Sequence, residues 1–224
     1  MTGDERTTAF INSLDPGNTP FLDEIEKEAK KTNVPIIRTE MQSFIKLLLA
    51  VKKPASVLEV GCAIGFSALL MSEYAPAGCT ITTIEKYEKR IPIALENFRR
   101  AGKEDCITLL EGDAADWLKK LDGPYDFIFM DAAKGQYIHW LSDIVRLMAP
   151  GAMLFSDNVL QEGTIVQSRY GVERRDRTIH GRMREYLYRL KHMKELETAI
   201  VPVGDGVALS VLKDQRKETE RNTG

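Results

Sequence analysis

The fold class is decided by one stretch, Ser56-Val-Leu-Glu-Val-Gly-Cys-Ala-Ile-Gly-Phe-Ser67. Its apolar run carries a single acid, Glu59, breaks into the turn Gly61-x-x-x-Gly65, and restarts as the helical pattern Ala68-Leu-Leu-Met71. A strand, a glycine turn and a helix in this order are typical of the first unit of an open α/β sheet. The two glycines allow a tight turn and let a ligand approach the backbone. Ligands of such sheets bind at the carboxyl ends of the strands, near this first turn.

The spacing of the glycines differs from the dinucleotide fingerprint G-x-G-x-x-G, because Ala63 stands at the third position. A nucleoside without a pyrophosphate is therefore favoured over a dinucleotide as the ligand. The loop by itself leaves an equal alternative open, in which the turn only joins a strand to a helix. Residues further along the chain decide between the two interpretations.

Size and composition indicate one globular domain. The chain has 224 residues, of which 29% are charged and 43% hydrophobic, and its formal net charge is −2, which excludes a polycation. Its three cysteines, Cys62, Cys79 and Cys106, are unclustered, which predicts a reducing cytoplasm rather than a disulfide framework or a cysteine metal site. No apolar run approaches the length of a membrane span, so no membrane partner is expected.

The rhythm of apolar runs predicts an α/β fold with a doubly wound, mostly parallel sheet. The tight turn Val203-Gly-Asp-Gly206, with its Asp205-Gly206 pair, makes the last strand antiparallel. We expect a single domain over residues 1–224, with a helical N-terminal extension (1–53) as a lid or dimer contact, a core (54–213) and a flexible tail (214–224). Seven strands are expected at about 57–60, 80–85, 106–111, 126–131, 152–157, 196–202 and 207–213, and helices near 20–32, 38–51, 65–75, 87–101, 114–121 and 135–149, with one more ending near Met193.

Acidic residues stand at the ends of the second and third predicted strands. Glu85 closes the second strand, where a carboxylate is well placed to accept the two hydroxyls of a ribose. Asp113 follows the third strand and either accepts from an adenine amino group or caps the next helix, since aspartate before a helix is a common cap. Both interpretations of Asp113 stay open.

Oxygen-bearing side chains also follow the fourth and fifth strands. Asp131 ends the fourth strand, and Asp157 and Asn158 end the fifth. Neighbouring strands of a doubly wound sheet would bring the three together, and clustered oxygen ligands suit Mg²⁺ better than zinc. Taken singly, Asp157 and Asn158 are better explained as turn residues and Asp131 as a cap. As a set they favour a metal.

Lys134 follows Asp131 by three residues, so on the first turn of a helix its side chain would point to the same place. An ammonium beside a divalent cation has a lowered pKa, and a neutral lysine can accept a proton from a bound hydroxyl. The alternative is a solvated surface lysine, which is the usual environment of this residue.

These residues together resemble the metal-dependent O-methyltransferases of catechol and caffeoyl-CoA type, over about residues 30–213. The resemblance implies a Rossmann-like seven-stranded fold, S-adenosylmethionine as methyl donor and Mg²⁺ or another divalent cation. The motifs that carry it are Glu59-Val-Gly-Cys-Ala-Ile-Gly-Phe-Ser67, Glu85, Gly112-Asp-Ala114, Asp131-Ala-Ala-Lys134 and Asp157-Asn158.

By position, the resemblance implies three sets of site residues. The metal ligands would be Asp131, Asp157 and Asn158, and the catalytic residues Asp131 and Lys134, with Lys134 as the base. The cofactor would be bound by Ile37, Glu59, Gly61, Ala63, Gly65, Ser67, Glu85, Asp113, Ala114 and Asp131.

Within that family, the bacterial tRNA 5-hydroxyuridine methyltransferases share further stretches with the chain. These are Val34-Pro-Ile36, Asp131-Ala-Ala-Lys-Gly-Gln-Tyr137, Asp157-Asn-Val-Leu160 and Pro202-Val-Gly-Asp-Gly206. This resemblance implies Mg²⁺-dependent methylation of the 5-hydroxyl of 5-hydroxyuridine in tRNA, giving 5-methoxyuridine, with the anticodon region of tRNA as partner and a homodimer as the assembly. A catechol also presents two adjacent oxygens, so a small catechol-like or CoA-linked phenol stays open as the substrate.

The charge distribution bears on this choice. Residues 169–194 hold nine Lys/Arg against three Asp/Glu, a net charge of +6 in a chain of net charge −2. A local basic patch is typical of phosphate binding, and Tyr170, Tyr186 and Tyr188 are expected to offer stacking faces for unpaired bases. A solvated helix is the alternative, and Asp176 interrupts the arginines. The candidate RNA contacts are Arg169, Arg174, Arg175 and Arg177.

Overall fold

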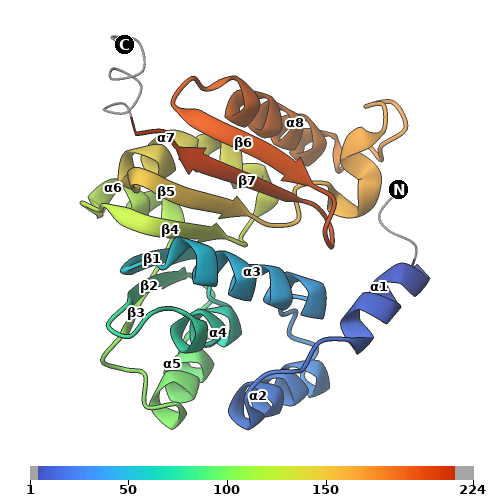
Figure 1. Cartoon of the computed structure of the whole chain (residues 1–224). Helices are drawn as coiled ribbons and strands as arrows, with labels where there is room; N and C mark the ends of the chain where they lie inside the picture. The colour runs from blue at the N-terminus through green and yellow to red at the C-terminus, as the bar shows by residue number, and fades with distance from the viewer. Residues whose placement is uncertain (1–4, 215–224) are drawn as a thin grey trace. The chain divides into compact units, whose positions relative to one another are not determined.

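A computed structural model describes residues 5–214 of the chain (Figure 1). The chain forms two compact units, and their described parts are residues 5–120 and 121–214. The flexible tail expected from residue 214 onward lies outside the described residues except for Asp214.

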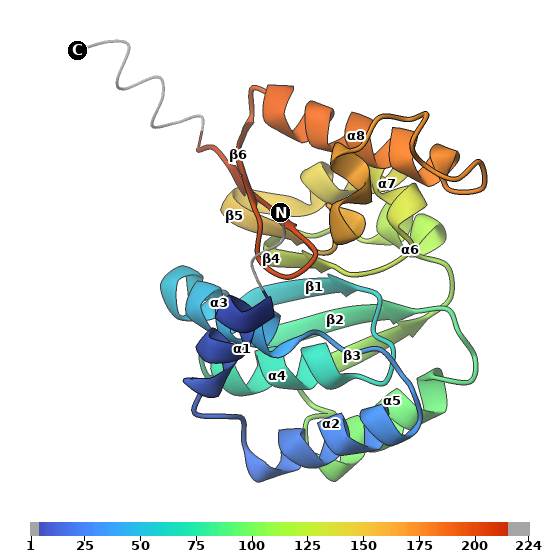
Figure 2. The same cartoon turned by 90° about the vertical axis from the view of Figure 1, so that its right-hand side faces the viewer.

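The first unit holds three parallel strands, β1 (Ser56–Val60), β2 (Thr80–Glu85) and β3 (Ile107–Glu111), with β2 paired to both neighbours. Helices α2 and α3 contact α4, α4 and α6 contact β2, and α5 contacts β3. Figure 2 shows α4 and α5 on the same side of these strands. The helices of this unit are α1 (Glu5–Ser13), α2 (Pro20–Lys31), α3 (Thr39–Lys52), α4 (Phe66–Tyr74), α5 (Ile91–Arg100) and α6 (Ala114–Lys120).

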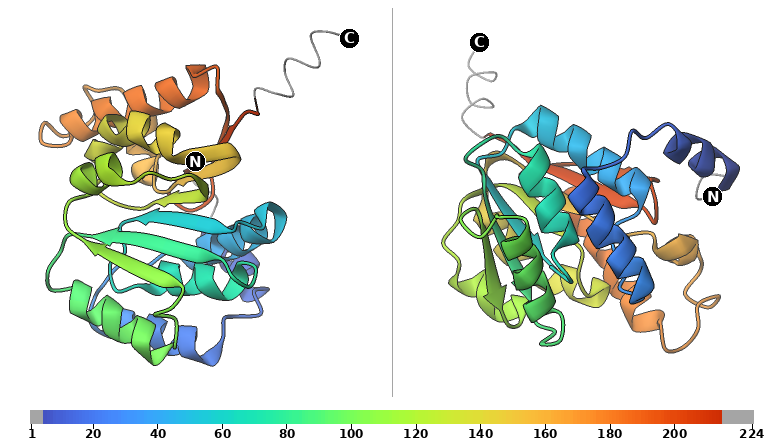
Figure 3. Two further views of the ribbon diagram at one scale, coloured as in Figure 1. Left: turned by 90° about the vertical axis from the view of Figure 1, so that its left-hand side faces the viewer. Right: turned by 90° about the horizontal axis from the view of Figure 1, so that it is seen from below.

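The second unit holds β4 (Tyr125–Met130) and β5 (Met148–Ser156), which are parallel, and β6 (Leu196–Val201) and β7 (Val207–Leu212). Strand β7 runs antiparallel to both β5 and β6. Helix α8 contacts α7, β6 and two 3₁₀ helices, η1 and η2 (Figure 3). The helical elements are η1 (Lys134–Gln136), α7 (Tyr137–Leu147), η2 (Gln161–Val166) and α8 (Arg177–His192).

The seven strands form one sheet in the order β3-β2-β1-β4-β5-β7-β6. The predicted α/β fold, with seven strands and an antiparallel last strand, is therefore confirmed. The apolar run of β1 is explained by burial, since the side chains of Val57, Leu58 and Val60 are fully buried. The same holds for Phe127–Met130 in β4, because strands covered on both faces read as continuous apolar runs.

Three predicted boundaries were wrong, each for a local reason. The helix expected from residue 87 begins at Ile91, because the Glu85 carboxylate accepts from Lys86 N and Tyr87 N and holds a turn there. Strand β5 begins at Met148 rather than 152, and Pro150 is accommodated where the β4–β5 register shifts. The turn between the last strands runs from Val203 to Gly206. It is closed by Gly206 N donating to Val203 O at 2.9 Å, so its central residues are Gly204 and Asp205, not Asp205-Gly206.

Candidate active site

The loop between β1 and α4 is tied to the neighbouring strand by its backbone. Gly61 N and Cys62 N both donate to Ile84 O, at 3.0 and 3.2 Å, and Gly65 N donates to Cys62 O at 2.8 Å. From α5, the buried Asn97 side chain donates to Ile64 O at 2.9 Å. The loop that was predicted to hold the cofactor is therefore fixed by hydrogen bonds on two sides.

Gly65 has a packing reason to be glycine. It is the residue before α4 and has φ +85°, a conformation that favours glycine. A Cβ at this position would lie 2.9 Å from Phe98 Cζ. The glycine spacing read from the sequence is thus accounted for in part by the close approach of the Phe98 ring.

The Glu85 carboxylate, at the end of β2, accepts three backbone hydrogen bonds. Its Oε2 accepts from Ala63 N at 2.7 Å, and its Oε1 accepts from Lys86 N at 2.9 Å and Tyr87 N at 2.8 Å. A carboxylate has about four acceptor positions, so these three bonds leave about one. To accept both hydroxyls of a ribose, Glu85 would have to release one of its backbone donors.

Asp113 caps the start of α6. Its Oδ1 accepts from Ala115 N at 2.9 Å and its Oδ2 lies 3.3 Å from Lys86 Nζ. The backbone hydrogen bond from Ala115 is the main cause of the lowered pKa of Asp113, and Lys86 adds to it. Of its two interpretations, the structure contains the cap; contact with adenine stays a prediction.

The other predicted cofactor residues of this unit are mostly buried. Glu59 is fully buried and accepts a hydrogen bond from Thr83 Oγ1. Ile37, Ser67 and Ala114 are buried at 5%, 8% and 7% exposure. Ile37 O also accepts from Gln42 Nε2 at 3.0 Å, which fixes the segment that enters α3.

In the second unit, the structure brings together the oxygen-bearing side chains that follow β4 and β5. Asn158 Nδ2 lies 3.5 Å from Asp131 Oδ1, and Asn158 N donates to Asp157 Oδ1 at 2.7 Å. Asp157 is only 2% exposed. Burial, followed by the nearby Asp131 carboxylate, raises the pKa of Asp157 to about 7.

Lys134 lies in the same cluster. Its Nζ is 2.7 Å from Asp131 Oδ1 and 3.1 Å from the Tyr137 hydroxyl. Burial by itself would lower the pKa of Lys134, but Tyr137 and the Asp131 carboxylate raise it above its ordinary value. Without a cation beside it, the ammonium is stabilised as the charged form by these acidic groups, and the lowered pKa expected beside a divalent cation stays a prediction.

Tyr137 is the site residue to which the sequence analysis gave no role. It is fully buried, its hydroxyl donates to Met130 O at 2.9 Å, and it accepts from Ala132 N at 3.2 Å and from Lys134 Nζ. Burial raises its pKa to about 12. The three-residue spacing from Lys134 to Tyr137 was the available signal, since residues three apart on a helix are neighbours.

The donor set of this cluster fits a divalent cation that prefers oxygen ligands. Two carboxylates and one side-chain amide meet there, and Asp157 is buried beside a second carboxylate, an arrangement that added positive charge stabilises. The Lys134 ammonium supplies positive charge to Asp131. Within residues 5–214, no group of three or more His, Cys, Asp or Glu side chains forms a metal site, so Asn158 is needed to complete the set.

The basic segment is largely bound to the protein itself. The prediction that Tyr186 stacks on unpaired bases was wrong, because its fully buried ring packs against Tyr137. Arg175 pairs with Glu173 and Asp176 at 3.0 and 3.6 Å, and Arg189 pairs with Glu185 at 2.7 Å. Four further cations, Arg177, Arg182, Arg184 and Lys191, donate to backbone carbonyls. Among the described residues, Arg169, Arg174 and Lys194 have no such partner, so Arg169 and Arg174 are the predicted RNA contacts best placed to bind a ligand.

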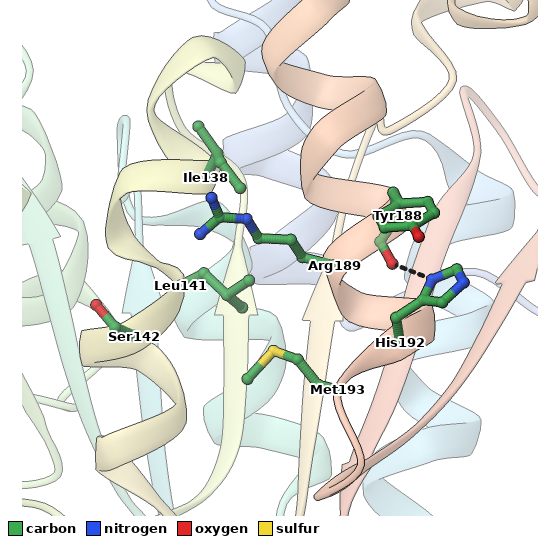
Figure 4. Close-up of a pocket in the computed structure, with 7 residues that line it drawn as sticks. All are labelled: Ile138, Leu141, Ser142, Tyr188, Arg189, His192 and Met193. Atoms are coloured by element: carbon green, nitrogen blue, oxygen red, sulfur yellow. Dashed lines mark hydrogen bonds between the residues drawn. The ribbon is translucent and has the colours of Figure 1, made fainter.

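A separate groove of about 320 Å³ lies between α7 and α8 (Figure 4). Arg189 of α8 extends toward Ile138 and Leu141 of α7 across it, and His192 Nδ1 forms a hydrogen bond with Tyr188 O at 2.7 Å. None of the predicted site residues lines this groove, which is formed by Ile138, Leu141, Ser142, Tyr188, Arg189, His192 and Met193.

Comparison with known proteins agrees with this geometry. A family model described as O-methyltransferase matches residues 12–213. A catechol O-methyltransferase of Mycobacterium tuberculosis is 31% identical over 161 residues, which cover 70% of this chain and 73% of that protein. A second catechol O-methyltransferase, from Niastella koreensis, is 28% identical over 167 residues, covering 73% of this chain and 70% of its own.

A solved structure of a similar protein contains the product of the methyl donor. The SAH-bound crystal structure of the methyltransferase PaMTH1 of Podospora anserina superposes with a TM-score of 0.83 and 25% identity, covering 94% of this chain and 95% of that one. The chain therefore belongs to the O-methyltransferase family. It is an S-adenosylmethionine-dependent enzyme of the catechol and caffeoyl-CoA type. In the described part of the chain, no helix has the length and apolarity to span a membrane.

Proposed function

We propose that the protein transfers a methyl group from S-adenosylmethionine to one of two adjacent oxygens of a small catechol-like or CoA-linked phenol, with Mg²⁺ or another divalent cation. The observation that carries this proposal is the cluster of Asp131, Asp157, Asn158 and Lys134 beyond β4 and β5. Further support comes from relatives named as catechol O-methyltransferases and, at 27% identity over 187 residues, from a caffeoyl-CoA O-methyltransferase of Populus trichocarpa.

Asp131, Asp157 and Asn158 would hold the cation. When bound, a divalent cation lowers the pKa of a coordinated hydroxyl and fixes a pair of oxygens. In the transfer, the bond from the methyl carbon to the cofactor sulfur breaks and a bond from that carbon to the substrate oxygen forms. The hydroxyl proton leaves to a base, and S-adenosylhomocysteine is released. A monohydroxylated ring offers only one oxygen and would be a much poorer substrate.

Lys134 is proposed as the residue that takes the hydroxyl proton. Its ammonium donates to Asp131 in the structure, so this role requires the neutral amine when substrate is bound. Lys134→Arg separates the two possible roles, because arginine keeps a positive charge beside Asp131 and cannot be deprotonated. Lys134→Met removes the charge as well. If Lys134 accepts the proton, both variants lose turnover; if it acts only through its charge, Lys134→Arg keeps turnover.

The test compares matched acceptors. Purified protein, labelled cofactor and Mg²⁺ are incubated with a 1,2-dihydroxyphenyl compound, the matching monohydroxyphenyl compound and tRNA, and products are identified by mass spectrometry. We expect one methyl group on the dihydroxyphenyl compound and about none on the monohydroxyphenyl compound. Equal methylation of the two phenols would overturn the requirement for two adjacent oxygens.

A second candidate substrate is 5-hydroxyuridine in tRNA, through methylation of its 5-hydroxyl. One observation favours it: Arg169, Arg174 and the 89% exposed Tyr170 lie on the segment that follows η2. Cations and an exposed aromatic ring together suit a nucleic acid. The phosphates of a CoA-linked phenol would suit the same arginines.

Salt dependence distinguishes these two uses of the arginines. If tRNA is the substrate, Arg169→Ala with Arg174→Ala should weaken tRNA binding and reduce its salt slope by about two contacts. The control is Arg99→Ala, an exposed arginine of α5 that pairs with Glu96. An unchanged salt slope, together with turnover of the small phenol, would exclude the tRNA interpretation.

We also propose a homodimer and a cytoplasmic location. Helices α1 and α3 are in contact, and apolar side chains are exposed there: Phe10 and Ile11 on α1, Leu14 directly after α1, and Leu47 and Val51 on α3. Such a patch is typical of a protein–protein contact. All three cysteines are free thiols, which suits a reducing compartment. Leu47→Glu with Val51→Glu should lower the mass measured by light scattering from that of a dimer to that of a monomer.

A further inference from the structure

The segment that carries Asp157 and Asn158 is held by backbone hydrogen bonds on both sides. On one side, Asp157 N donates to Met130 O of β4 at 2.9 Å. On the other, the turn between β6 and β7 (Val203–Gly206) accepts two bonds: Val159 N donates to Gly206 O at 2.9 Å and Leu160 N donates to Asp205 O at 2.8 Å. The turn therefore forms hydrogen bonds with the backbone of the two residues that directly follow Asn158.

Asn158 has an unusual backbone conformation between these two anchors. Its φ is +55°, in the left-handed region, which asparagine adopts more readily than most other non-glycine residues. Such a conformation persists only where the surrounding structure imposes it. Here the flanking bonds from Asp157 N and Val159 N supply that constraint, and the conformation directs the Asn158 amide to Asp131.

Gly206 makes the contact of the turn possible. Its φ is +83°, and a Cβ built on it would lie 2.7 Å from Leu160 Cβ. Because Leu160 Cβ is attached directly to the backbone, rotation of the side chain cannot relieve this overlap. Any larger residue at position 206 must push the Val159–Leu160 backbone away from the turn.

We propose that the Val203–Gly206 turn is a positioning element for the oxygen cluster, and that Gly206 aligns Asp157 and Asn158 by admitting Leu160 against its Cα. The inference rests on the proposed cation site. It predicts that Gly206→Ala weakens cation binding without adding or removing any ligand. Groups that orient metal ligands typically change the affinity for the metal by about 10- to 100-fold when they are lost.

The experiment uses a matched pair of glycine substitutions. Gly151 also has a positive φ, +75°, but no atom lies within 4 Å of the Cβ that alanine would add. Gly206→Ala and Gly151→Ala therefore carry a similar backbone strain, and only Gly206→Ala disturbs Leu160. Three quantities are measured in the full-length variants: Mn²⁺ affinity, from the electron paramagnetic resonance signal of free Mn²⁺, hydrogen exchange of the Val159 and Leu160 amides without metal, and binding of S-adenosylhomocysteine.

We expect Gly206→Ala to speed exchange of both amides and to weaken Mn²⁺ binding by about 10- to 100-fold relative to Gly151→Ala. Binding of S-adenosylhomocysteine by calorimetry should match in the two variants. Unchanged exchange and Mn²⁺ affinity in Gly206→Ala would overturn the inference. Mn²⁺ binding that is absent from the unsubstituted protein would instead overturn the proposed cation site and this inference with it, so the two failures are distinguishable.

A second variant covers the case in which Gly206→Ala does not fold. Leu160→Ala removes the side-chain atoms that pack on Gly206 but adds no overlap and keeps both backbone bonds. It should weaken Mn²⁺ binding in the same direction by a smaller factor. A Leu160→Ala protein that binds Mn²⁺ as tightly as the unsubstituted protein would also overturn the role of this contact.

Discussion

Lys134 Nζ donates to the Tyr137 hydroxyl at 3.1 Å, and this hydroxyl is itself fixed by donating to Met130 O at 2.9 Å. Met130 is the last residue of β4, so the amine of Lys134 is positioned by the strand that carries Asp131 at its end. The backbone of η1 is held as well, because Arg182 donates to Gly135 O at 3.3 Å. The lysine proposed as base is therefore part of a hydrogen-bonded network.

Tyr137→Phe tests this network. It leaves the part-buried Ala132 N without its acceptor and removes one of the two hydrogen bonds to Met130 O, which keeps the bond from Asp157 N, so we expect the free energy of unfolding to fall by about 1–3 kcal/mol. A general base contributes about 10²- to 10⁴-fold to turnover. Turnover of this variant should fall by a smaller factor, because Lys134 remains. Urea unfolding and steady-state kinetics measure both. Tyr188→Phe, at a 63% exposed position of α8, is the control and should change neither quantity.

Removal of the cation, or of one of its ligands, should stop turnover and spare the cofactor. We expect excess chelator and Asp131→Ala each to abolish methylation, while calorimetry still detects S-adenosylhomocysteine binding. Asp143→Ala, which removes an aspartate of α7 that pairs with Arg146, is the matched control and should stay active. Full activity in the presence of chelator would remove the metal from the mechanism.

Gly65→Ala should destabilise the first unit more than a comparable substitution elsewhere in it. Gly78 has nearly the same φ, +83°, with no atom within 4 Å of an added Cβ, so Gly78→Ala should cost only the backbone term of about 1–2 kcal/mol. Gly65→Ala adds the overlap with Phe98, a further cost of about 1–3 kcal/mol. Thermal unfolding of both variants gives the difference. Equal stabilities would show that Phe98 moves aside freely.

Cys62 should resist alkylation in the native protein. Burial, followed by the nearby Glu59 carboxylate, raises its pKa well above the ordinary value of a thiol. A raised pKa means that the reactive thiolate stays scarce as the pH rises from 7 to about 9, where an ordinary thiol ionises. Iodoacetamide labelling followed by peptide mass spectrometry should find the partly exposed Cys106 modified and Cys62 unmodified. Rapid labelling of Cys62 at pH 8 would contradict its burial.

The order of elements was predictable because the local signals agreed with the final fold. The run at Val57–Val60 and the glycines after it read as strand, turn and helix, and β1, the loop and α4 follow in that order. Acids at strand ends were equally visible. The positions of Asp131, Asp157 and Asn158 needed only the rule that neighbouring parallel strands end on the same edge.

Sequence alone determined which residue types stand at the strand ends, since a pattern with a period of two or 3.6 residues assigns each position to a strand or a helix. Only the tertiary structure decided what these residues contact. Asp113 caps α6, and the Lys134 ammonium donates to the Tyr137 hydroxyl. Arg175 forms an ion pair with Glu173 in its own segment. Gly206 gained its importance from Leu160, 46 positions earlier in the chain. A pKa, a hydrogen bond or a steric overlap depends on atoms brought together from distant positions, and local patterns in the chain do not encode those distances.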